Sequence, residues 1–150
     1  MQILTVPALS VVRQRHHLTL PQVGLTGLDA CPAVSAAAAA AGLQPAGPWI
    51  FAAHGMPRDA HTAFDLDYCL PVAGGEDCLP AFHCASAIYE GPLTGLFPQG
   101  YAPLLAAVAA AGLATTGDTR EVYHIWDGPE AATNRVEIQI GLADGAGAGA

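Results

Sequence analysis

The sequence places one acidic residue, Glu121, in a run of bulky side chains that alternate between the two faces of an expected strand. Glu121 and Tyr123 point to one face, and Val122 and His124 point to the other. A carboxylate walled by aromatic rings is costly to keep ionised, so we expect burial to raise its pKa. A bound cation reverses that balance, because ring faces add about 0.5 to 2 kcal/mol for each desolvated cation–π contact. This chemistry suits a flat, hydrophobic cation.

Aromatic partners for Glu121 come from two other stretches of the chain. Trp49 and Phe51 share its facing if the internal repeat described below keeps its register, and Tyr89 lies at a strand end nearby. Taken singly, core packing explains Trp49, Phe51 and Tyr123, because buried aromatic side chains are ordinary. As a group they predict a ligand pocket formed by Glu121, Tyr123, Trp49, Phe51 and Tyr89.

A simpler role for Glu121 is a half-exposed ion pair across the sheet with Arg135 or Arg13. His54 and His124 lie at equivalent positions of the repeat, on the face opposite to Glu121. We therefore expect structural roles for both histidines.

The spacing of cysteines, histidines and serines predicts no metal site, cofactor or nucleophile. There is no Cys-x-x-Cys pair, and the adjacent His83 and Cys84 point to opposite faces of a strand. No residue stands out as a haem ligand, and Ser86 lacks a Gly-x-Ser-x-Gly context. A buried Glu121 with a raised pKa could still act with Tyr123 as a general acid or base. The residues thus leave open whether a ligand is bound or hydrolysed.

The composition predicts a single globular domain. The 150 residues are 52% hydrophobic and only 12% charged, which favours extensive burial. Thirteen acids outnumber five arginines, lysine is absent, and the net charge of −8 argues against direct binding of nucleic acid. Neither a basic leader nor a long apolar run is present, so we expect a cytoplasmic protein with no membrane segment and with reduced cysteines. The oligomeric state is left open.

An internal repeat divides the chain into two halves. The residues AAGL at 40–43 recur at 110–113, an offset of 70, and His54 meets His124 at the same offset. The halves span about residues 1–74 and 81–143 and form one domain. The Gly/Ala-rich residues 144–150 are predicted to be a disordered tail.

Each half is predicted to fold as strand, helix, strand, strand. An early proline and a late glycine bracket each helix, and alternating bulky residues mark the strands. The expected strands are 8–20, 48–54, 64–72, 82–89, 119–126 and 135–142, and the expected helices are 31–42 and 100–112. The result is an α+β fold of tandem duplicated β-α-β-β units with pseudo-twofold symmetry. Because a helix covers only one side of each small sheet, the other sides should meet or line a central crevice.

Several short motifs, taken together, carry a resemblance to a known family. They are REVYHIWDGP at 120–129, QIGL at 139–142, GL at 42–43, GP at 47–48, DYCLPV at 67–72 and YEGP at 89–92. Their order and spacing over residues 8–142 resemble those of GyrI-like small-molecule-binding domains. These are the effector-binding domains of multidrug-responsive transcription activators, and they also occur as stand-alone proteins.

The resemblance implies a crevice with aromatic walls and one acidic residue that faces bound, often cationic, aromatic compounds. Glu121 matches the acidic position. Leu93 departs from the family pattern, which usually has an aromatic residue after the Gly-Pro pair. No helix-turn-helix precedes the expected first strand, so regulation of DNA would require a separate regulatory protein.

The preferred hypothesis is a stand-alone protein that binds hydrophobic, in part cationic, small molecules. The alternative is a hydrolase of reactive xenobiotics, because some GyrI-like proteins hydrolyse cyclopropane-containing toxins with a pocket acid and an aromatic partner. Here that pair would be Glu121 with Tyr123. A third hypothesis is an interaction module whose crevice is filled by its own side chains.

Overall fold

The computed structural model describes residues 1–143, and its centre is one eight-stranded antiparallel sheet. The strands are β1 (Gln2–Val6), β2 (Leu9–Leu18), β3 (Ile50–His54), β4 (Phe64–Pro71), β5 (Cys78–Leu79), β6 (Phe82–Glu90), β7 (Thr115–Ile125) and β8 (Arg135–Leu142). Their order in the sheet is β1-β6-β8-β7-β3-β4-β2-β5. The predicted tail, 144–150, lies outside the described residues.

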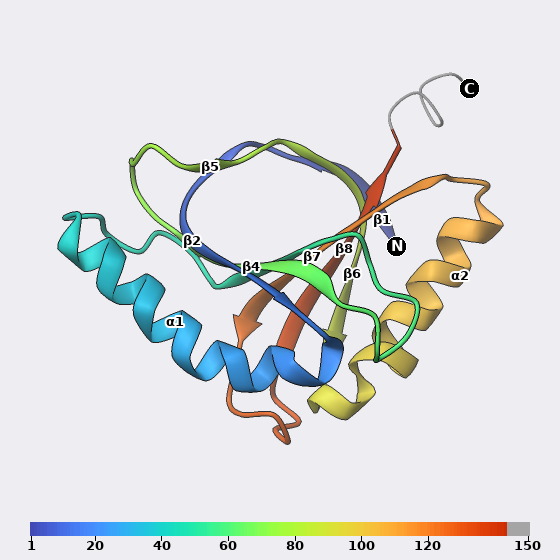
Figure 1. Ribbon diagram of the computed structural model, residues 1–150. Coiled ribbons are helices and arrows are strands. Elements are labelled where there is room, and N and C mark those ends of the chain that lie inside the picture. Colours follow the sequence, from blue (N-terminus) through green and yellow to red (C-terminus); the bar gives the residue numbers. More distant parts are fainter. Residues whose placement is uncertain (144–150) are drawn as a thin grey trace.

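The α+β fold is confirmed, but the expectation of two small sheets is wrong. β3 of the first half pairs with β7 of the second half, so the halves share one sheet. β1, which lies outside the predicted strands, pairs with β6 at one edge, while β2 pairs with β4 and β5 at the other. The sheet is also strongly curled. Figure 1 shows β1, β2 and β5 curving round one side of it while both helices cover the other.

The first helix, α1 (Val23–Ala40), begins earlier than the predicted residue 31 and follows a short turn, η1 (Leu20–Gln22). The prediction took Pro32 as a first-turn signal, but Pro32 lies inside the helix. A proline removes the hydrogen bond to the carbonyl four residues earlier. That carbonyl belongs to Leu28, which is 72% exposed, so it lies on the solvent side of the helix.

The second helix, α2 (Ala102–Ala110), is shorter than the predicted 100–112. It continues from η2 (Leu93–Gly95) and from η3 (Leu96–Tyr101), a wider π-helical turn. A Cβ atom added to Gly100 would lie 2.7 Å from Ile138 Cδ1 and 3.2 Å from Tyr89 Cβ. The missing side chain at Gly100 thus lets η3 pack directly on the sheet.

The two helices end in turns of the same type. Gly42 and Gly112 both have a φ of +70°, a conformation that disfavours residues with a Cβ atom. In each case the amide of the following leucine donates to the carbonyl five residues earlier. The offset of 70 in the sequence is therefore also found in the backbone geometry.

Each helix buries its own cluster on the covered face of the sheet. The side chains buried between α1 and the sheet include Leu18, Ala30, Phe64, Leu66, Tyr68, Val34, Ala38, Leu70 and Val72. Those buried between the sheet and α2 with η3 include Ala85, Tyr89, Leu96, Leu104, Val108, Val136, Ile138 and Ile140. Paired residues of neighbouring strands point to the same face. The register sets one row across the sheet between the helices, namely Tyr68, Phe51, Glu121 and Ile138.

Two helical stretches, Leu20–Ala40 and Leu93–Ala110, are long and apolar enough to cross a membrane by length and composition alone. Both also pack on the sheet, with Val34 of α1 and Leu104 of α2 buried. Core helices pass the same test, so these stretches are weak evidence for a membrane.

Candidate functional site

Glu121 lies at the centre of the sheet, on its pseudo-twofold axis. It pairs directly with Phe51, the residue at the equivalent position of the first half. The pairs on either side follow the same symmetry. Ile50 pairs with Val122 and Ala52 pairs with Arg120, while by the offset of 70 Ile50 is equivalent to Arg120 and Ala52 to Val122. The axis therefore passes between Phe51 and Glu121, where the two halves join.

Two tyrosines donate hydrogen bonds to the Glu121 carboxylate. Tyr101, at the end of η3, donates to Oε2, and Tyr123 of β7 donates to Oε1 at 2.5 Å. Burial raises the pKa of Glu121 above its ordinary value of 4.5, although the two phenol hydrogen bonds oppose the shift. Burial, together with the adjacent carboxylate, raises the pKa of both phenols well above 10, so they remain hydrogen-bond donors at neutral pH.

Aromatic rings connect this carboxylate to the cluster beneath α1. Phe51 meets Tyr123 and Tyr68 edge-on, with ring centroids 4.7 Å apart in both pairs. Tyr68, which the sequence analysis did not single out, is buried and donates to the carbonyl of Val23 at 2.6 Å. The wall of the site on this side is therefore a packed row of rings.

Two outer rings contact the phenols that bind Glu121. Trp126 meets Tyr123 edge-on with centroids 5.7 Å apart, and Phe97 stacks on Tyr101 at 6.2 Å. Trp126 is 46% exposed and Phe97 is 60% exposed. The site thus includes two exposed aromatic residues, each in contact with a phenol that binds Glu121.

The structure brings together three of the five residues predicted to bind a ligand: Glu121, Tyr123 and Phe51. Trp49 packs instead against the cluster of Val34, Ala38, Leu70 and Val72 beneath α1. Tyr89 is buried beneath η3, and its hydroxyl donates to the Pro92 carbonyl at 2.6 Å. Within residues 1–143 neither side chain forms a hydrogen bond with Glu121, and neither stacks on the two phenols that do.

The alternative ion pair of Glu121 with Arg13 or Arg135 does not form among the described residues. Arg13 lies on the other face of the sheet and binds Asp67 and Asp77. Glu121 instead accepts hydrogen bonds from two phenols, and within residues 1–143 it forms no ion pair with a basic side chain.

Sequence reasoning missed Tyr101, the second phenol of the site. The repeat gives no hint, because Cys31 occupies the equivalent position of the first half. The available signal is Gly100, where a side chain would collide with Ile138, the neighbour of Glu121 in β8. A glycine at this point brings the following residue close to the sheet.

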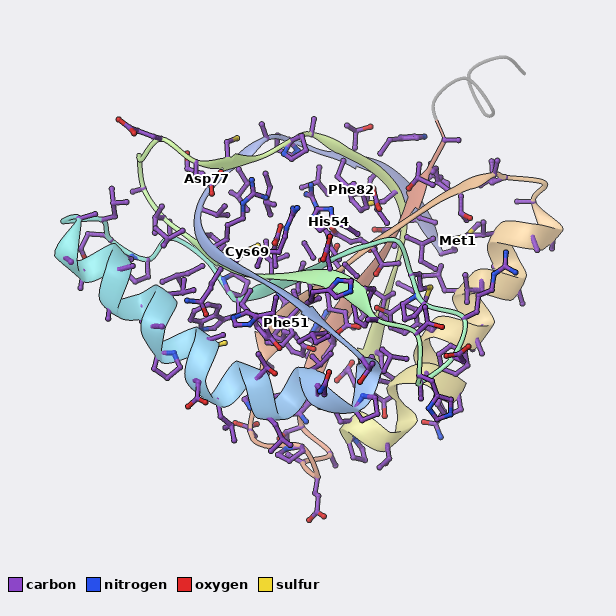
Figure 2. The ribbon with its side chains drawn as sticks, in the orientation of Figure 1. Met1, Phe51, His54, Cys69, Asp77 and Phe82 are labelled. Carbon is purple, nitrogen blue, oxygen red and sulfur yellow. The ribbon has the colours of Figure 1, made fainter. Side chains whose placement is uncertain are left out.

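A separate polar cluster occupies the opposite face of the sheet. Asp67 is fully buried and accepts hydrogen bonds from Arg13, Arg15 and His54. Burial alone would raise the pKa of Asp67, but the hydrogen bonds and charges of Arg15 and His54 outweigh it and hold the pKa below 3.8. Figure 2 shows His54 in the space enclosed by the curled strands, whereas Phe51 lies on the helix side.

A second cluster on this face repeats the first. His124 binds Glu137 at 2.9 Å, and both residues are equivalent by the offset of 70 to His54 and Asp67. Ser86 donates to the same carboxylate at 3.0 Å. A hydrolytic triad needs the serine hydroxyl on the histidine, whereas here both bind the acid. Within residues 1–143 no group of His, Cys, Asp or Glu could hold a metal ion.

Arg120, the neighbour of Glu121, faces this second side. It is 5% exposed, its guanidinium lies 4.2 Å from the centre of the Phe82 ring, and it donates to the Pro80 carbonyl at 2.9 Å. The sheet therefore separates the charges of Arg120 and Glu121, and Arg120 does not neutralise the site.

Two surface hollows lie away from Glu121, beside the C-terminal end of α1. One of about 440 Å³ is lined by residues that include Arg13, Leu43 and Asp77. The other, of about 240 Å³, is lined by residues that include Ala38 and Leu70. The open crevice expected at Glu121 is neither of these hollows, since the side chains of the site contact one another there.

Comparisons with solved structures identify the fold. The crystal structure of the EcmrR C-terminal domain superimposes with a TM-score of 0.77 at 20% identity, covering 95% of this chain and 96% of that chain. The structure of SAV2435 bound to tetraphenylphosphonium gives 0.56 at 11% identity, covering 95% and 93%. The chain has the GyrI-like fold.

Other comparisons agree with the GyrI-like fold or find nothing. EcmrR in a complex with DNA gives a TM-score of 0.75 at 20% identity, and the match covers 94% of this chain but only 56% of that one. A putative bacterial transcription regulation protein from Staphylococcus aureus MU50 gives 0.55 at 12% identity, covering 94% and 96%. No family model and no curated protein matches the sequence.

Proposed function

We propose that this protein binds hydrophobic organic cations at Glu121. The observation that carries the proposal is the carboxylate on the pseudo-twofold axis, held by Tyr101 and Tyr123 and without a cationic partner among the described residues. SAV2435, which shares the fold, has been solved with tetraphenylphosphonium, a cation of this class.

The energetics of the site favour a ligand that brings a positive charge. Burial raises the pKa of Glu121, so the ionised carboxylate is destabilised while no cation is present. A cation beside it removes that cost, and the faces of Tyr123 and Phe51 add cation–π and apolar contact. Because Phe97 and Trp126 are exposed, their rings can move aside to admit a ligand.

The test compares two ions of the same shape and opposite charge. Tetraphenylphosphonium and tetraphenylborate are titrated by calorimetry into wild type, Glu121→Gln and the control Glu137→Gln. Glu137 is a half-buried acid of the neighbouring strand, but it faces the opposite side of the sheet. We expect Glu121→Gln to weaken binding of the phosphonium by about tenfold or more, since each tenfold loss corresponds to about 1.4 kcal/mol.

Wild type and the control should bind the phosphonium alike and prefer it to the borate. Equal affinity for the two ions, or an equal loss in Glu137→Gln, would overturn the proposal. Circular dichroism on all three proteins shows whether each variant is folded.

Hydrolysis of a reactive xenobiotic is the second candidate function, because a carboxyl group with a raised pKa beside a phenol can act as an acid or base. Glu121 would be the acid or base and Tyr123 its partner. Mass spectrometry of cyclopropane-containing toxins after incubation separates the two functions. Turnover that disappears in Glu121→Gln supports the hydrolase, and unchanged compound supports the binding protein.

We propose that any readout on DNA requires a separate protein, since the net charge of −8 repels phosphate backbones. EcmrR was solved in a complex with DNA, but this chain covers only 56% of that chain. Filter binding of the purified chain to duplex DNA at low salt tests whether the chain binds DNA by itself, and retention of the DNA on the filter would contradict the proposal.

A cytoplasmic location and stand-alone action stay predictions.

A further inference from the structure

We propose that the outer face of α1 is a dimer interface, on which a second copy of this chain packs its own α1 in the antiparallel direction. The face consists of exposed residues at helical spacing, called here the outer stripe. The stripe comprises Leu25, Leu28, Pro32, Ser35, Ala36 and Ala39. This inference does not depend on the binding of a ligand at Glu121.

The outer stripe lies on the side of α1 that faces away from the sheet. Residues three or four positions apart share one side of a helix, and this side is opposite to the buried Ala30, Val34 and Ala38. Leu25 and Leu28 are each 72% exposed, the highest fraction among the exposed large hydrophobic residues of the described chain. Figure 1 shows α1 at the outside of the molecule, where it packs on β2 and β4. A helix at the surface of a monomer normally has polar residues on this side, so the stripe indicates a binding surface.

The two ends of the outer stripe differ in size and fit each other. The N-terminal end has the two leucines, Leu25 and Leu28, whereas the C-terminal end has only the small side chains of Ser35, Ala36 and Ala39. Ser35 and Ala39 also line the hollow of about 240 Å³ at the C-terminal end of α1. Each copy therefore has both a pair of exposed bulky side chains and a recess that can receive such a pair.

A twofold axis that passes near Pro32 brings these two ends together. Turning one copy by 180° reverses its helix, so Leu25 of one copy lies opposite Ala39 of the other, and Leu28 lies opposite Ala36. The leucines then fill the space that the alanines leave. The contact also closes on itself, as in most homodimers. A parallel pair would place leucine against leucine and leave a gap between the alanines.

The single charge of α1 favours the same arrangement. Asp29 is the one charged residue of the helix. It lies three residues from Pro32, so the two copies of Asp29 are about 9 Å apart along the helix axis and a further 8 to 10 Å apart between axes, about 12 Å in all. This distance exceeds the Debye length of about 8 Å at physiological ionic strength. Ser35 of the second copy lies opposite Asp29, and its hydroxyl can donate to this carboxylate or to the Leu28 carbonyl that Pro32 leaves free.

A lipid surface is the other occupant that an apolar helix face suits, and the charge of the chain argues against it. Helices that lie on membranes carry lysine and arginine beside the apolar face. α1 has neither residue, and the net charge of −8 repels anionic lipid headgroups.

The size of the stripe predicts a weak dimer. The 18 residues of α1 form a helix about 27 Å long and about 10 Å wide. The contact is therefore smaller than the standard interface of about 800 Å² per partner. We expect a dissociation constant in the micromolar range.

The experiment measures the mass of the purified chain by sedimentation equilibrium at concentrations from about 1 μM to about 1 mM. Wild type is compared with Leu25→Glu, with the double variant Leu25→Glu/Ala39→Lys and with the matched double variant Leu25→Glu/Ala33→Lys. Ala33 is exposed but lies outside the outer stripe. The control for apolar surface in general is Ile3→Glu, because Ile3 is 46% exposed and lies in β1, whereas α1 packs on β2 and β4.

The mass of wild type should rise from 15.3 kDa towards twice that value as the concentration increases. Leu25→Glu should weaken the dimer at least about tenfold, since the twofold axis repeats the change in both copies. Ala39→Lys should restore part of the affinity, because residues 25 and 39 lie about 21 Å apart in one helix and meet only between copies. Ala33→Lys should not restore it, and Ile3→Glu should dimerise like wild type.

Circular dichroism shows whether each variant is folded. A wild type that stays monomeric at every concentration overturns the interface, and so does an unchanged dimer in Leu25→Glu or an equal loss in Ile3→Glu. Equal affinities of the two double variants overturn the antiparallel arrangement. A monomer that sediments with phosphatidylcholine vesicles, and loses this binding in Leu25→Glu, assigns the face to lipid and overturns the dimer.

Discussion

Replacing Asp67 with asparagine should destabilise the protein far more than replacing its neighbour Asp65. Asp67 is fully buried, and its oxygens bind Arg13, Arg15 and His54. Removing one partner of a buried ion pair typically costs about 3 to 5 kcal/mol. The Arg15 side chain is 53% exposed, so water replaces part of the lost interaction. We therefore expect a loss near the lower limit, about 3 kcal/mol.

The measurement is urea unfolding followed by the fluorescence of Trp49 and Trp126, supported by thermal melting. A loss of about 3 kcal/mol corresponds to a fall in Tm of about 6 to 12 °C for a domain of this size. Asp65→Asn is the matched control, because Asp65 lies in the same strand and its side-chain partner within residues 1–143 is His17, at the exposed surface. A surface pair of this kind contributes about 0 to 1 kcal/mol.

The same variant should change the response to acid. The pKa of Asp67 is held below 3.8 in the folded protein, so its ion pairs stabilise the fold above that pH. This stabilisation is lost as the pH falls through the lowered pKa. Asp67→Asn should therefore be less stable than wild type at neutral pH and approach it in strong acid. Equal losses in Asp67→Asn and Asp65→Asn at neutral pH would refute the reasoning.

Three further predictions concern packing, thiols and proton linkage. Gly141→Ala should lower the free energy of unfolding in urea by about 1 to 3 kcal/mol, since its methyl group would lie 3.0 Å from a backbone oxygen of β7. Gly24→Ala has open space around it and lies in the first turn of α1, so it should stabilise the helix by at most about 0.5 kcal/mol, less than in a helix interior. The exposed Cys78 should react with Ellman's reagent in the native protein, while Cys69, buried with a pKa of about 12, should react only after unfolding; fast reaction of both would contradict this. Affinity for tetraphenylphosphonium should rise as the pH rises through the raised pKa of Glu121, because the cation favours the ionised carboxylate, and calorimetry across pH should show no such rise in Glu121→Gln.

The sequence predicted the duplicated units and six of the strands because their signals are local. Alternating side chains mark β7 and β8, and glycine marks both helix ends. The pairing of β3 with β7 joins residues about half the chain apart, and periodicity carries no information on which strands pair. The single sheet was therefore not predicted. The start of α1 was predicted too late because Pro32 was taken as a first-turn residue, whereas a proline is tolerated inside a helix where its lost hydrogen bond faces solvent.

The candidate site was predicted in part for the same reason. Glu121, Tyr123 and Phe51 lie on strands, where facing follows from counting residues once the register is known. Tyr101 lies in η3, a π-helical turn whose direction is set by packing on Ile138. Trp49 lies on the face that alternation predicts, but it comes just before β3 and packs against Leu70 and Val72 under α1, away from Glu121.

The duplication itself explains why the acid at the centre is single. Equivalent residues of the two halves pair directly at the axis, so Phe51 and Glu121 are cross-strand neighbours. Side chains opposed in this way lie about 4.5 to 5.5 Å apart at Cβ, and two carboxylates there would repel each other or share a proton. A symmetric pair of acids would hold one of them neutral, and a symmetric pair of phenylalanines would carry no charge. The asymmetric pair places one carboxyl group beside one ring, and this arrangement suits the hydrophobic monocation of the proposed function.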